Sequence, residues 1–268
     1  MNKSMNLPDI ALFTTEIAME AGQLIKAQRD AGTVNTSYKA QHELVTSADI
    51  AADKLIIARI KEKFPEHRIL SEETYTDRSQ VSNLVDPIWI IDPIDGTVNY
   101  AHGHFMVAVS IAFAVAGEVQ VGVVYNPFLD ELFCAHTQGG ATLNATPIQV
   151  STETQLNKAL IATGFPYNKS TVPEIVVRVE TALMHCQDIR RLGSAALDIC
   201  WVACGRLEGY FESLSPWDFA AARLIAQEAG AKCGHFNPVP DGIPACIYGE
   251  DILIANKTIY AELDKILQ

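Results

Sequence analysis

The chain has 268 residues, of which 49% are hydrophobic and 19% are charged, and its formal net charge is −12. This length and composition allow a large buried core and exclude an intrinsically disordered chain. The acidic balance argues against a nucleic-acid-binding surface, but small phosphorylated substrates stay open because a bound metal can reverse the local field of an acidic site.

Cysteine use and hydropathy point to a cytoplasmic protein. Six cysteines are scattered among apolar neighbours and form no CxxC pair. We therefore expect reduced thiols packed in a core. No charged and apolar signal segment opens the chain, and no apolar run approaches the roughly 18 residues of a membrane span. The expectation of a cytoplasmic location rests on these absences.

The first half predicts helices followed by an antiparallel meander. Apolar residues at helical spacing predict helices over 8–31 and 46–64, with a polar loop or irregular hairpin at 33–45 between them. Short β-rich runs then predict strands at 68–73, 88–91, 106–116, 119–125, 131–135 and 141–143.

The second half alternates between strands and helices. Strands are predicted at 159–163, 188–191, 207–211, 232–236 and 252–255, and helices at 173–184, 193–203, 217–229 and 257–267. Such alternation indicates α/β layering. Because no long linker interrupts the chain, we expect one domain over 1–268, with an antiparallel half to about 150 and an alternating half over about 151–268.

The most informative stretch runs from Asp86 to Tyr100. Its apolar residues at 88–91 predict a strand that delivers Asp92, and Pro93 is expected to end the pairing of that strand. Asp95 follows three residues after Asp92, and two carboxylates on a rigid turn suit Mg²⁺. The backbone N–H groups of Gly96 and Thr97, at the start of a helical turn, suit an anion.

Further acidic residues have structural as well as functional explanations. The adjacent Glu72 and Glu73 are typical of solvated surface when taken alone. Asp49 lies in a capping pattern, and its local sequence favours a role in capping the helix. Asp218 occupies the first turn of a helix, where the helix dipole favours an acid, but the small and apolar residues that follow predict a buried position.

Five segments together resemble the inositol monophosphatase family, in the family's order. Trp89–Tyr100 resembles its first signature and Trp217–Ala222 its second, and further family segments are matched by Ser71–Glu73, Leu44–Asp49 and Arg190–Ala196. The resemblance covers about residue 8 to the C-terminus. It implies an α/β fold, a five-layer α-β-α-β-α sandwich of the sugar-phosphatase type, in a homodimer. It also implies Mg²⁺-dependent, lithium-sensitive phosphomonoester hydrolysis with about two or three Mg²⁺ ions per site.

The resemblance also implies roles for individual residues. Metal ligands would be Glu72, Asp92, Asp95, Asp218 and the Ile94 carbonyl, while Glu73 would hold a metal-bound water. Thr97, paired with Asp49, would orient the attacking water, and Gly96 and Thr97 would bind the phosphate through their N–H groups. The expected substrate is a small polyol phosphate such as inositol 1-phosphate. Its alcohol part would contact Gly193, Ser194, Ala195 and Glu212.

The residues alone support the same chemistry. The chain offers many acidic ligands and no obvious Cys or Ser nucleophile with a base. Phosphate ester hydrolysis needs charge neutralisation, a nucleophile and an assisted leaving group, and paired metals roughly 3.5–4 Å apart provide all three. Direct attack by a metal-activated water is therefore favoured over a covalent intermediate.

The chain departs from the family pattern at four places. Ser71 stands where Gly is frequent, Tyr100 where Phe is usual, and Phe105 where many members have Pro. The span from Glu212 to Trp217 is one residue shorter than is common. The first three are expected to be tolerated, whereas the last puts the role of Glu212 in doubt.

Several rival functions remain open at this point. Fructose-1,6-bisphosphatase, histidinol phosphatase and 3′-nucleotidase are alternatives with the same fold. Arg190 and Arg191 are candidates for a nucleotide-binding patch, although a dimer-interface or structural role is favoured, and Val98-Asn99 replaces the Lys-Glu pair typical of the nucleotidase branch. A regulatory binding protein is an alternative of another class. A zinc enzyme using His102 and His104 competes with a simple exposed loop, which is favoured.

Overall fold

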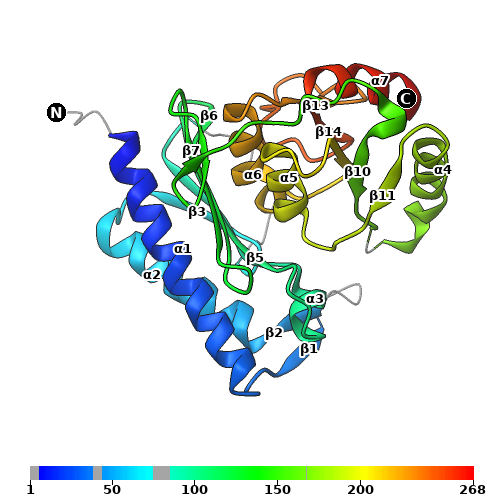
Figure 1. Ribbon diagram of the computed structural model, residues 1–268. Coiled ribbons are helices and arrows are strands. Elements are labelled where there is room, and N and C mark those ends of the chain that lie inside the picture. The colour runs from blue at the N-terminus through cyan, green and yellow to red at the C-terminus, as the bar shows by residue number, and fades with distance from the viewer. Residues whose placement is uncertain (1–5, 39–43, 75–84, 167) are drawn as a thin grey trace.

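Two β-sheets separated by a layer of helices form the protein (Figure 1). The computed structural model describes residues 6–38, 44–74, 85–166 and 168–268. Helices also cover the outer face of each sheet, so the layers alternate as helix, sheet, helix, sheet and helix. This arrangement is the five-layer sandwich expected from the sequence.

The first sheet carries the focal acidic stretch. Its strand order is β3-β4-β5-β6-β7-β8-β9, and β3 and β4 are parallel while the other neighbours are antiparallel. The strands are β3 (Arg68–Ser71), β4 (Ile88–Asp95), β5 (Ala108–Val115), β6 (Glu118–Asn126), β7 (Glu131–His136), β8 (Ala141–Leu143) and β9 (Thr146–Pro147). Every residue of β4 is buried, because helices pack on both faces of the sheet.

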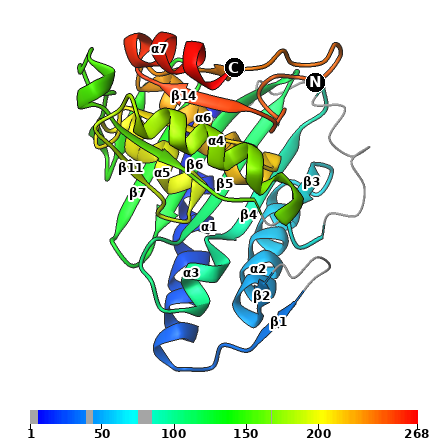
Figure 2. The ribbon, with the colours of Figure 1, turned by 90° about the vertical axis from the view of Figure 1, so that its right-hand side faces the viewer.

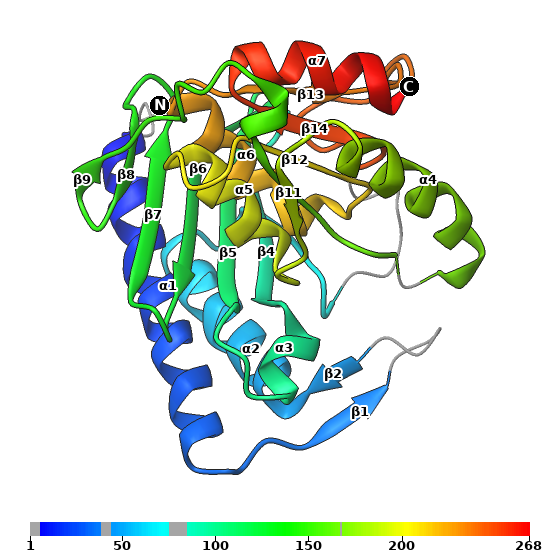
Figure 3. The ribbon, with the colours of Figure 1, turned by 45° about the vertical axis from the view of Figure 1, so that its right-hand side comes forward.

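Two long helices cover the outer face of the first sheet. In α1 (Leu7–Asp30), Ile10, Ile17 and Ile25 recur at helical spacing and are buried against β5, β6 and β7. Alongside it, α2 (Ser47–Lys63) packs on β4 and directs its N-terminus towards α3 (Thr97–Ala101). Figure 3 shows α1 and α2 behind the strands of this sheet.

The helices between the sheets are rich in small and apolar residues because both pack against other elements on several sides. These are α5 (Ala195–Ala203) and α6 (Pro216–Glu228), which pack on each other as well as on the sheets. Gly122 of β6 lets the backbone of α6 come close, since a Cβ there would overlap the Ala221 carbonyl oxygen. The Ser110 hydroxyl of β5 donates to the Trp217 carbonyl oxygen at 3.3 Å. These contacts place the N-terminus of α6 beside the acidic end of β4.

The second sheet has the order β11-β10-β12-β14-β13, in which β10 is parallel to β11 and β12 while β14 is antiparallel to its neighbours. Its strands are β10 (Leu160–Thr163), β11 (Asp188–Arg190), β12 (Gly209–Glu212), β13 (Lys232–His235) and β14 (Ile252–Ala255). Its outer face is covered by α4 (Val172–Leu183) and α7 (Lys257–Leu267). Short 3₁₀ turns, η3 (Leu156–Lys158) and η4 (Lys169–Thr171), precede β10 and α4.

The polar segment after α1 forms an antiparallel pair, β1 (Thr36–Tyr38) and β2 (Leu44–Thr46), as one of the two sequence interpretations expected. Figure 2 shows this pair near α3, at the edge of the molecule. Residues 39–43 of the expected loop lie outside the described residues.

The expectation that Pro93 ends strand pairing is wrong. β4 continues to Asp95, which pairs with Ala108 of β5, and the register shifts between Asp92 and Asp95. Proline has no N–H group to donate to the ladder, and an irregularity is where a sheet tolerates that loss. The resulting bend brings both Asp92 and Asp95 into the interior at the end of the strand.

Two composition-based expectations can be compared with the structure. All six cysteines are free thiols, with Cys200 and Cys246 buried and the others partly buried. Within the described parts of the chain, no helix has the length and apolar character needed to cross a bilayer. The assignment of a single domain to residues 1–268 stays a prediction.

Candidate active site and metal centre

Acidic side chains from four elements come together where β4 ends. Asp92 and Asp95 belong to β4, Glu72 follows β3, and Asp218 and Asp49 lie in the first turns of α6 and α2. The charges of the other four carboxylates all act on Asp92. Residues spread over most of the sequence therefore form one negatively charged cluster.

Asp92 and Asp95 are buried, at 2% and 7% exposure. Burial raises the pKa of Asp92 well above its ordinary value, and the charges of Glu72 and Asp95 raise it further. Burial also raises the pKa of Asp95, to about 6, against the opposing effect of hydrogen bonds from Ser194 and Ala196. Buried carboxylates that repel one another call for a compensating cation.

Asp49 caps a helix with one oxygen and contacts Thr97 with the other. Its Oδ2 accepts from the Thr46 N–H at 2.8 Å, which completes a capping box at the start of α2. Its Oδ1 accepts from the Thr97 hydroxyl at 3.0 Å. That hydroxyl also lies 3.0 Å from the Ile94 carbonyl oxygen, but a carboxylate is the stronger acceptor. The capping and functional explanations of Asp49 are therefore compatible.

Asp218 repeats this arrangement at the start of α6. Its Oδ2 accepts from the Ser215 N–H at 2.8 Å as part of a capping box. Burial raises the pKa of Asp218 well above its ordinary value, and the charges of Asp95 and Glu72 raise it further. One oxygen caps the helix, and the negative charge belongs to the cluster.

The chemistry of this cluster suits a hard cation, but the side chains stand apart. Carboxylate and carbonyl oxygens are the ligands that Mg²⁺ prefers, and the Ile94 carbonyl lies between the two Asp residues of β4. Among the described residues, no three His, Cys, Asp or Glu side chains converge closely enough to form a metal-binding group. Glu72 and Glu73 lie in the turn that follows β3. The charge of Glu72 acts on Asp92 from there.

The turn after β4 depends on a glycine. Gly96 has a φ of +92°, and a Cβ there would lie 2.8 Å from the Met106 carbonyl oxygen and 3.0 Å from that of Gly193. Asn99 of α3 donates to the carbonyl oxygens of Met106, at 2.8 Å, and Leu192, at 2.7 Å. The N-terminus of α3, with Gly96 and Thr97, is thereby held against the segment that precedes α5.

The N-terminus of α5 binds the carboxylate of Asp95. The backbone N–H of Ala196 donates to Asp95 Oδ2 at 2.8 Å, and the N–H of Ala195 donates to Oδ1 at 3.3 Å. The hydroxyl of Ser194, the N-cap residue of α5, also donates to Asp95 Oδ2. Asp95 therefore joins the first sheet to the helices between the sheets.

A cavity of about 160 Å³ opens beside these residues. Its lining includes Asp95, Gly96, Asp218, Gly193, Ser194, Ala195, Asp198, Arg191, Phe165 and Glu212. Gly96, suggested for phosphate, and all four residues suggested for the alcohol part of a substrate thus border one space, whereas Thr97 is not part of its lining. The shortened span after Glu212 has not moved that residue away from the cavity.

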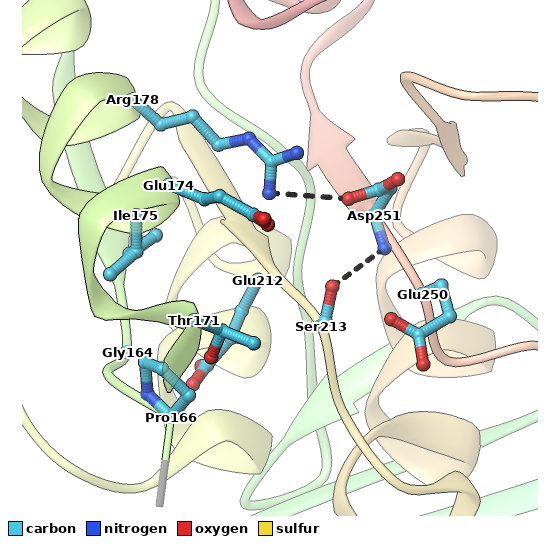
Figure 4. Close-up of a pocket in the computed structure, with 10 residues that line it drawn as sticks. All are labelled: Gly164, Pro166, Thr171, Glu174, Ile175, Arg178, Glu212, Ser213, Glu250 and Asp251. Atoms are coloured by element: carbon cyan, nitrogen blue, oxygen red, sulfur yellow. Dashed lines mark hydrogen bonds and ion pairs between the residues drawn. The ribbon is translucent and has the colours of Figure 1, made fainter. Parts of the chain in front are cut away.

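Glu212 is set at the border of a second cavity of about 220 Å³. Tyr210 donates its hydroxyl to Glu212 Oε2, and burial raises the pKa of Glu212 to about 7. Gly164, with no side chain, leaves room for this carboxylate and borders both cavities. Figure 4 shows the second cavity, where Arg178 pairs with Asp251 at 3.2 Å.

Two departures from the family pattern have local explanations. Ser71 donates its hydroxyl to Asp53 of α2, which holds the end of β3 against that helix. Tyr100 donates its hydroxyl to the Ile25 carbonyl oxygen of α1 at 2.7 Å, a bond that Phe would lack. Phe105 is exposed. The contacts of Ser71 and Tyr100 join elements around the site to the outer helices and involve none of the carboxylates of the cluster.

The sequence interpretation missed Asp198, and the structure places Arg191, a candidate for a patch near the site, at the cavity. Arg191 borders the smaller cavity, with its guanidinium 5.4 Å from the ring of Phe165, and its charge acts on Asp95, Asp198 and Glu212. A single acid among the apolar residues of α5 was the available signal for Asp198. Arg190 instead pairs with Asp188 at 2.6 Å. His102 and His104 are exposed, and in the described chain they belong to no metal-binding group.

Comparisons with known proteins agree on one family. The sequence model of the inositol monophosphatase family matches residues 7–267. Inositol-1-monophosphatase of Synechocystis is 43% identical over 228 residues, covering 84% of this chain and 77% of that protein. Nus factor SuhB of Vibrio cholerae is 41% identical over 217 residues, covering 80% of each chain.

Solved structures confirm the fold. The extragenic suppressor protein suhB of Bartonella henselae matches with a TM-score of 0.86 at 31% identity, covering 97% of this chain and 98% of that one. Inositol monophosphatase of Anabaena matches with a TM-score of 0.82 at 36% identity, covering 98% and 96%. The layered α/β fold expected from the sequence is confirmed.

Proposed function

The chain belongs to the inositol monophosphatase family and is a phosphoric monoester hydrolase, and from this premise we propose that it hydrolyses a small polyol phosphate in a Mg²⁺-dependent reaction. The observation that carries the proposal is the cluster of buried and half-buried carboxylates at the end of β4, facing the N-terminus of α3. Inositol 1-phosphate is the proposed substrate, because relatives named inositol monophosphatase are about as similar to this chain as the relatives with another name.

The proposed metal ligands are Glu72, Asp92, Asp95, Asp218 and the Ile94 carbonyl, with Glu73 holding a water next to them. Two or more bound Mg²⁺ ions would neutralise the phosphoryl oxygens and lower the pKa of a water molecule. The carboxylates stand apart in the protein alone, in keeping with their mutual repulsion. Inward rotation of these side chains is therefore part of the proposal.

Thr97 and Asp49 are proposed to orient the attacking water. When the Thr97 hydroxyl donates to Asp49, its lone pairs remain to accept a hydrogen bond from water. As water loses this proton to Thr97, Thr97 passes its own proton to the Asp49 carboxylate. The water oxygen then forms a bond to phosphorus as the bond to the alcohol oxygen breaks, and the alcohol leaves with a proton from solvent. The N–H groups of Gly96 and Thr97, which precede the first intrahelical bonds of α3, bind the phosphate.

The experiment that tests this function measures phosphate release with and without Mg²⁺ across a panel of phosphomonoesters. The panel consists of inositol 1-phosphate, fructose 1,6-bisphosphate, histidinol phosphate and adenosine 3′,5′-bisphosphate. We expect the highest kcat/KM for inositol 1-phosphate and inhibition by lithium. A higher kcat/KM for another member of the panel would make that compound the preferred substrate, and the proposed hydrolysis reaction would stand.

A binding function is the second candidate, because several relatives of similar identity carry the name Nus factor SuhB. All the carboxylates that the reaction needs are present in this chain, so the name does not argue against catalysis. Absence of phosphate release from every substrate in the panel would favour the binding function.

We further propose that the protein is a homodimer. The outer helix α4 exposes Val176, Val177, Leu183 and Met184, and Phe105 and Phe165 near the site are also exposed. Apolar side chains exposed in this number are typical of an interface. Light scattering on the purified protein gives the mass directly, and a monomer at micromolar concentration would contradict the proposal.

A further inference from the structure

Asp198 is a buried carboxylate that the proposed reaction does not use. It lies on α5, one turn beyond the N-cap Ser194, and is 2% exposed. In the described structure its Oδ1 is buried and has no hydrogen-bond partner. An unpartnered buried acceptor destabilises a protein, and such groups in native structures usually have a functional reason.

The side chain borders the cavity where a substrate would lie. Asp198 shares this cavity of about 160 Å³ with Gly96, which is proposed to bind the phosphate, and with Glu212. Rotation of an Asp carboxylate about its Cβ–Cγ bond is easy, so either oxygen can be turned to the cavity. A molecule bound in the cavity is the partner within reach.

The surroundings of Asp198 select the chemistry of that partner. Asp198 and Glu212 both present acceptors, and one oxygen of Glu212 is already occupied by the Tyr210 hydroxyl. A ligand must therefore supply hydrogen-bond donors. The positive charge of Arg191 acts on both carboxylates and disfavours an ammonium group in the same space. Neutral hydroxyl groups satisfy both conditions.

We propose that Asp198 is a specificity-determining residue that, beside Glu212, accepts a hydrogen bond from a hydroxyl group of the leaving alcohol. This inference rests on the proposed polyol phosphatase function and adds a second acceptor to it. The charge of Asp95, a proposed metal ligand, also acts on Asp198, so the test must separate an effect on the alcohol part from an effect on the metal cluster.

The test compares a ligand that has the alcohol part with one that lacks it. In Asp198→Asn, kcat/KM for inositol 1-phosphate should fall roughly 10-fold, because an NH₂ group replaces one of the two oxygens and a hydrogen bond to the substrate is lost. The inhibition constant of inorganic phosphate, which has no alcohol part, should change less than about 2-fold. Asp264→Asn, an equal charge change at a half-buried position of the outer helix α7, should leave both values unchanged.

A second comparison needs only changes in the substrate. Removing single hydroxyl groups from inositol 1-phosphate should lower kcat/KM in the wild-type protein, and for one of these groups the loss should vanish in Asp198→Asn. A melting curve of each variant verifies that it is folded. If no deoxy substrate has a lower kcat/KM than inositol 1-phosphate in the wild-type protein, the inference is overturned.

The outcomes separate this inference from the function on which it rests. Equal changes in kcat/KM and in the phosphate inhibition constant would show that Asp198 acts through the metal cluster or the fold, and would overturn the inference while the function stands. No hydrolysis of any polyol phosphate by the wild-type protein would overturn the proposed substrate class, and the inference with it.

Discussion

The replacement Asp49→Asn separates the contacts of the two oxygens of this side chain, of which Oδ2 accepts from both the N–H and the hydroxyl of Thr46. Oδ2 accepts from the Thr46 N–H at 2.8 Å and Oδ1 from the Thr97 hydroxyl at 3.0 Å. An amide has only one oxygen, and the backbone N–H of Thr46 can only donate. The Asn oxygen must therefore face Thr46, and its NH₂ group must face the Thr97 hydroxyl.

This geometry reverses the hydrogen bond at Thr97 while the helix cap survives. Thr97 then accepts from Asn and turns its own proton to the Ile94 carbonyl oxygen, so no carboxylate is left to take a proton from water through Thr97. Loss of a positioned proton acceptor lowers kcat on the order of 100-fold. Complete loss of a cap costs about 1 kcal/mol, so retention of the cap keeps the change in unfolding free energy below that value.

The assay is steady-state phosphate release, with urea unfolding and the Mg²⁺ concentration for half-maximal activity measured on the same preparations. We expect kcat to fall about 100-fold while both other quantities stay close to wild type. Asp264→Asn serves as the charge-matched control, with unchanged kcat. Near-normal kcat in Asp49→Asn would refute the reasoning and leave Asp49 as a helix cap only.

The other predictions concern the carboxylate cluster and Thr97. Asp95→Asn and Asp218→Asn should lower turnover about 100-fold or more while the fold survives, and near-normal activity in either variant would contradict the metal assignment. Thr97→Ala should lower kcat more than it weakens Mg²⁺ binding; the reverse result would make Thr97 a scaffold residue. The metal-free protein should lose stability as the pH rises. A carboxyl whose pKa is raised on folding favours the folded state below its unfolded value, near 3.8 for Asp95, and that contribution is lost as the pH rises through about 6. Melting temperatures should therefore fall between about pH 4 and pH 7 without metal, and Mg²⁺ should raise them more at pH 8 than at pH 5; a flat metal-free profile would contradict the burial of the cluster.

Local patterns in the sequence predicted the elements well, because apolar periodicity and turn residues act over a few positions. The alternation of the second half and the buried character of β4 are examples. Pro93 is the exception. The rule that proline ends pairing is local, whereas the bulge that accommodates it depends on the partner strand β5.

The site could be predicted as a set of residues but not as a geometry. For Asp49 the sequence offers helix capping and a catalytic role as alternatives, whereas in the structure the cap uses Oδ2 and the contact with Thr97 uses Oδ1. The contact that decides this joins residues 48 positions apart, and the contact between Asp95 and Ser194 joins residues 99 positions apart. Asp198 went unnoticed because its importance comes from the cavity it borders and from the missing partner of its Oδ1.

The central claim is that the carboxylate cluster at the end of β4 supports metal-dependent phosphomonoester hydrolysis. Its most direct test is phosphate release from inositol 1-phosphate by the purified protein, first stripped of metal with a chelator and then titrated with Mg²⁺. We expect no turnover in the stripped protein, activity that returns as Mg²⁺ is added, and no such return in Asp95→Asn. Turnover in the stripped protein equal to that at saturating Mg²⁺ would contradict the claim.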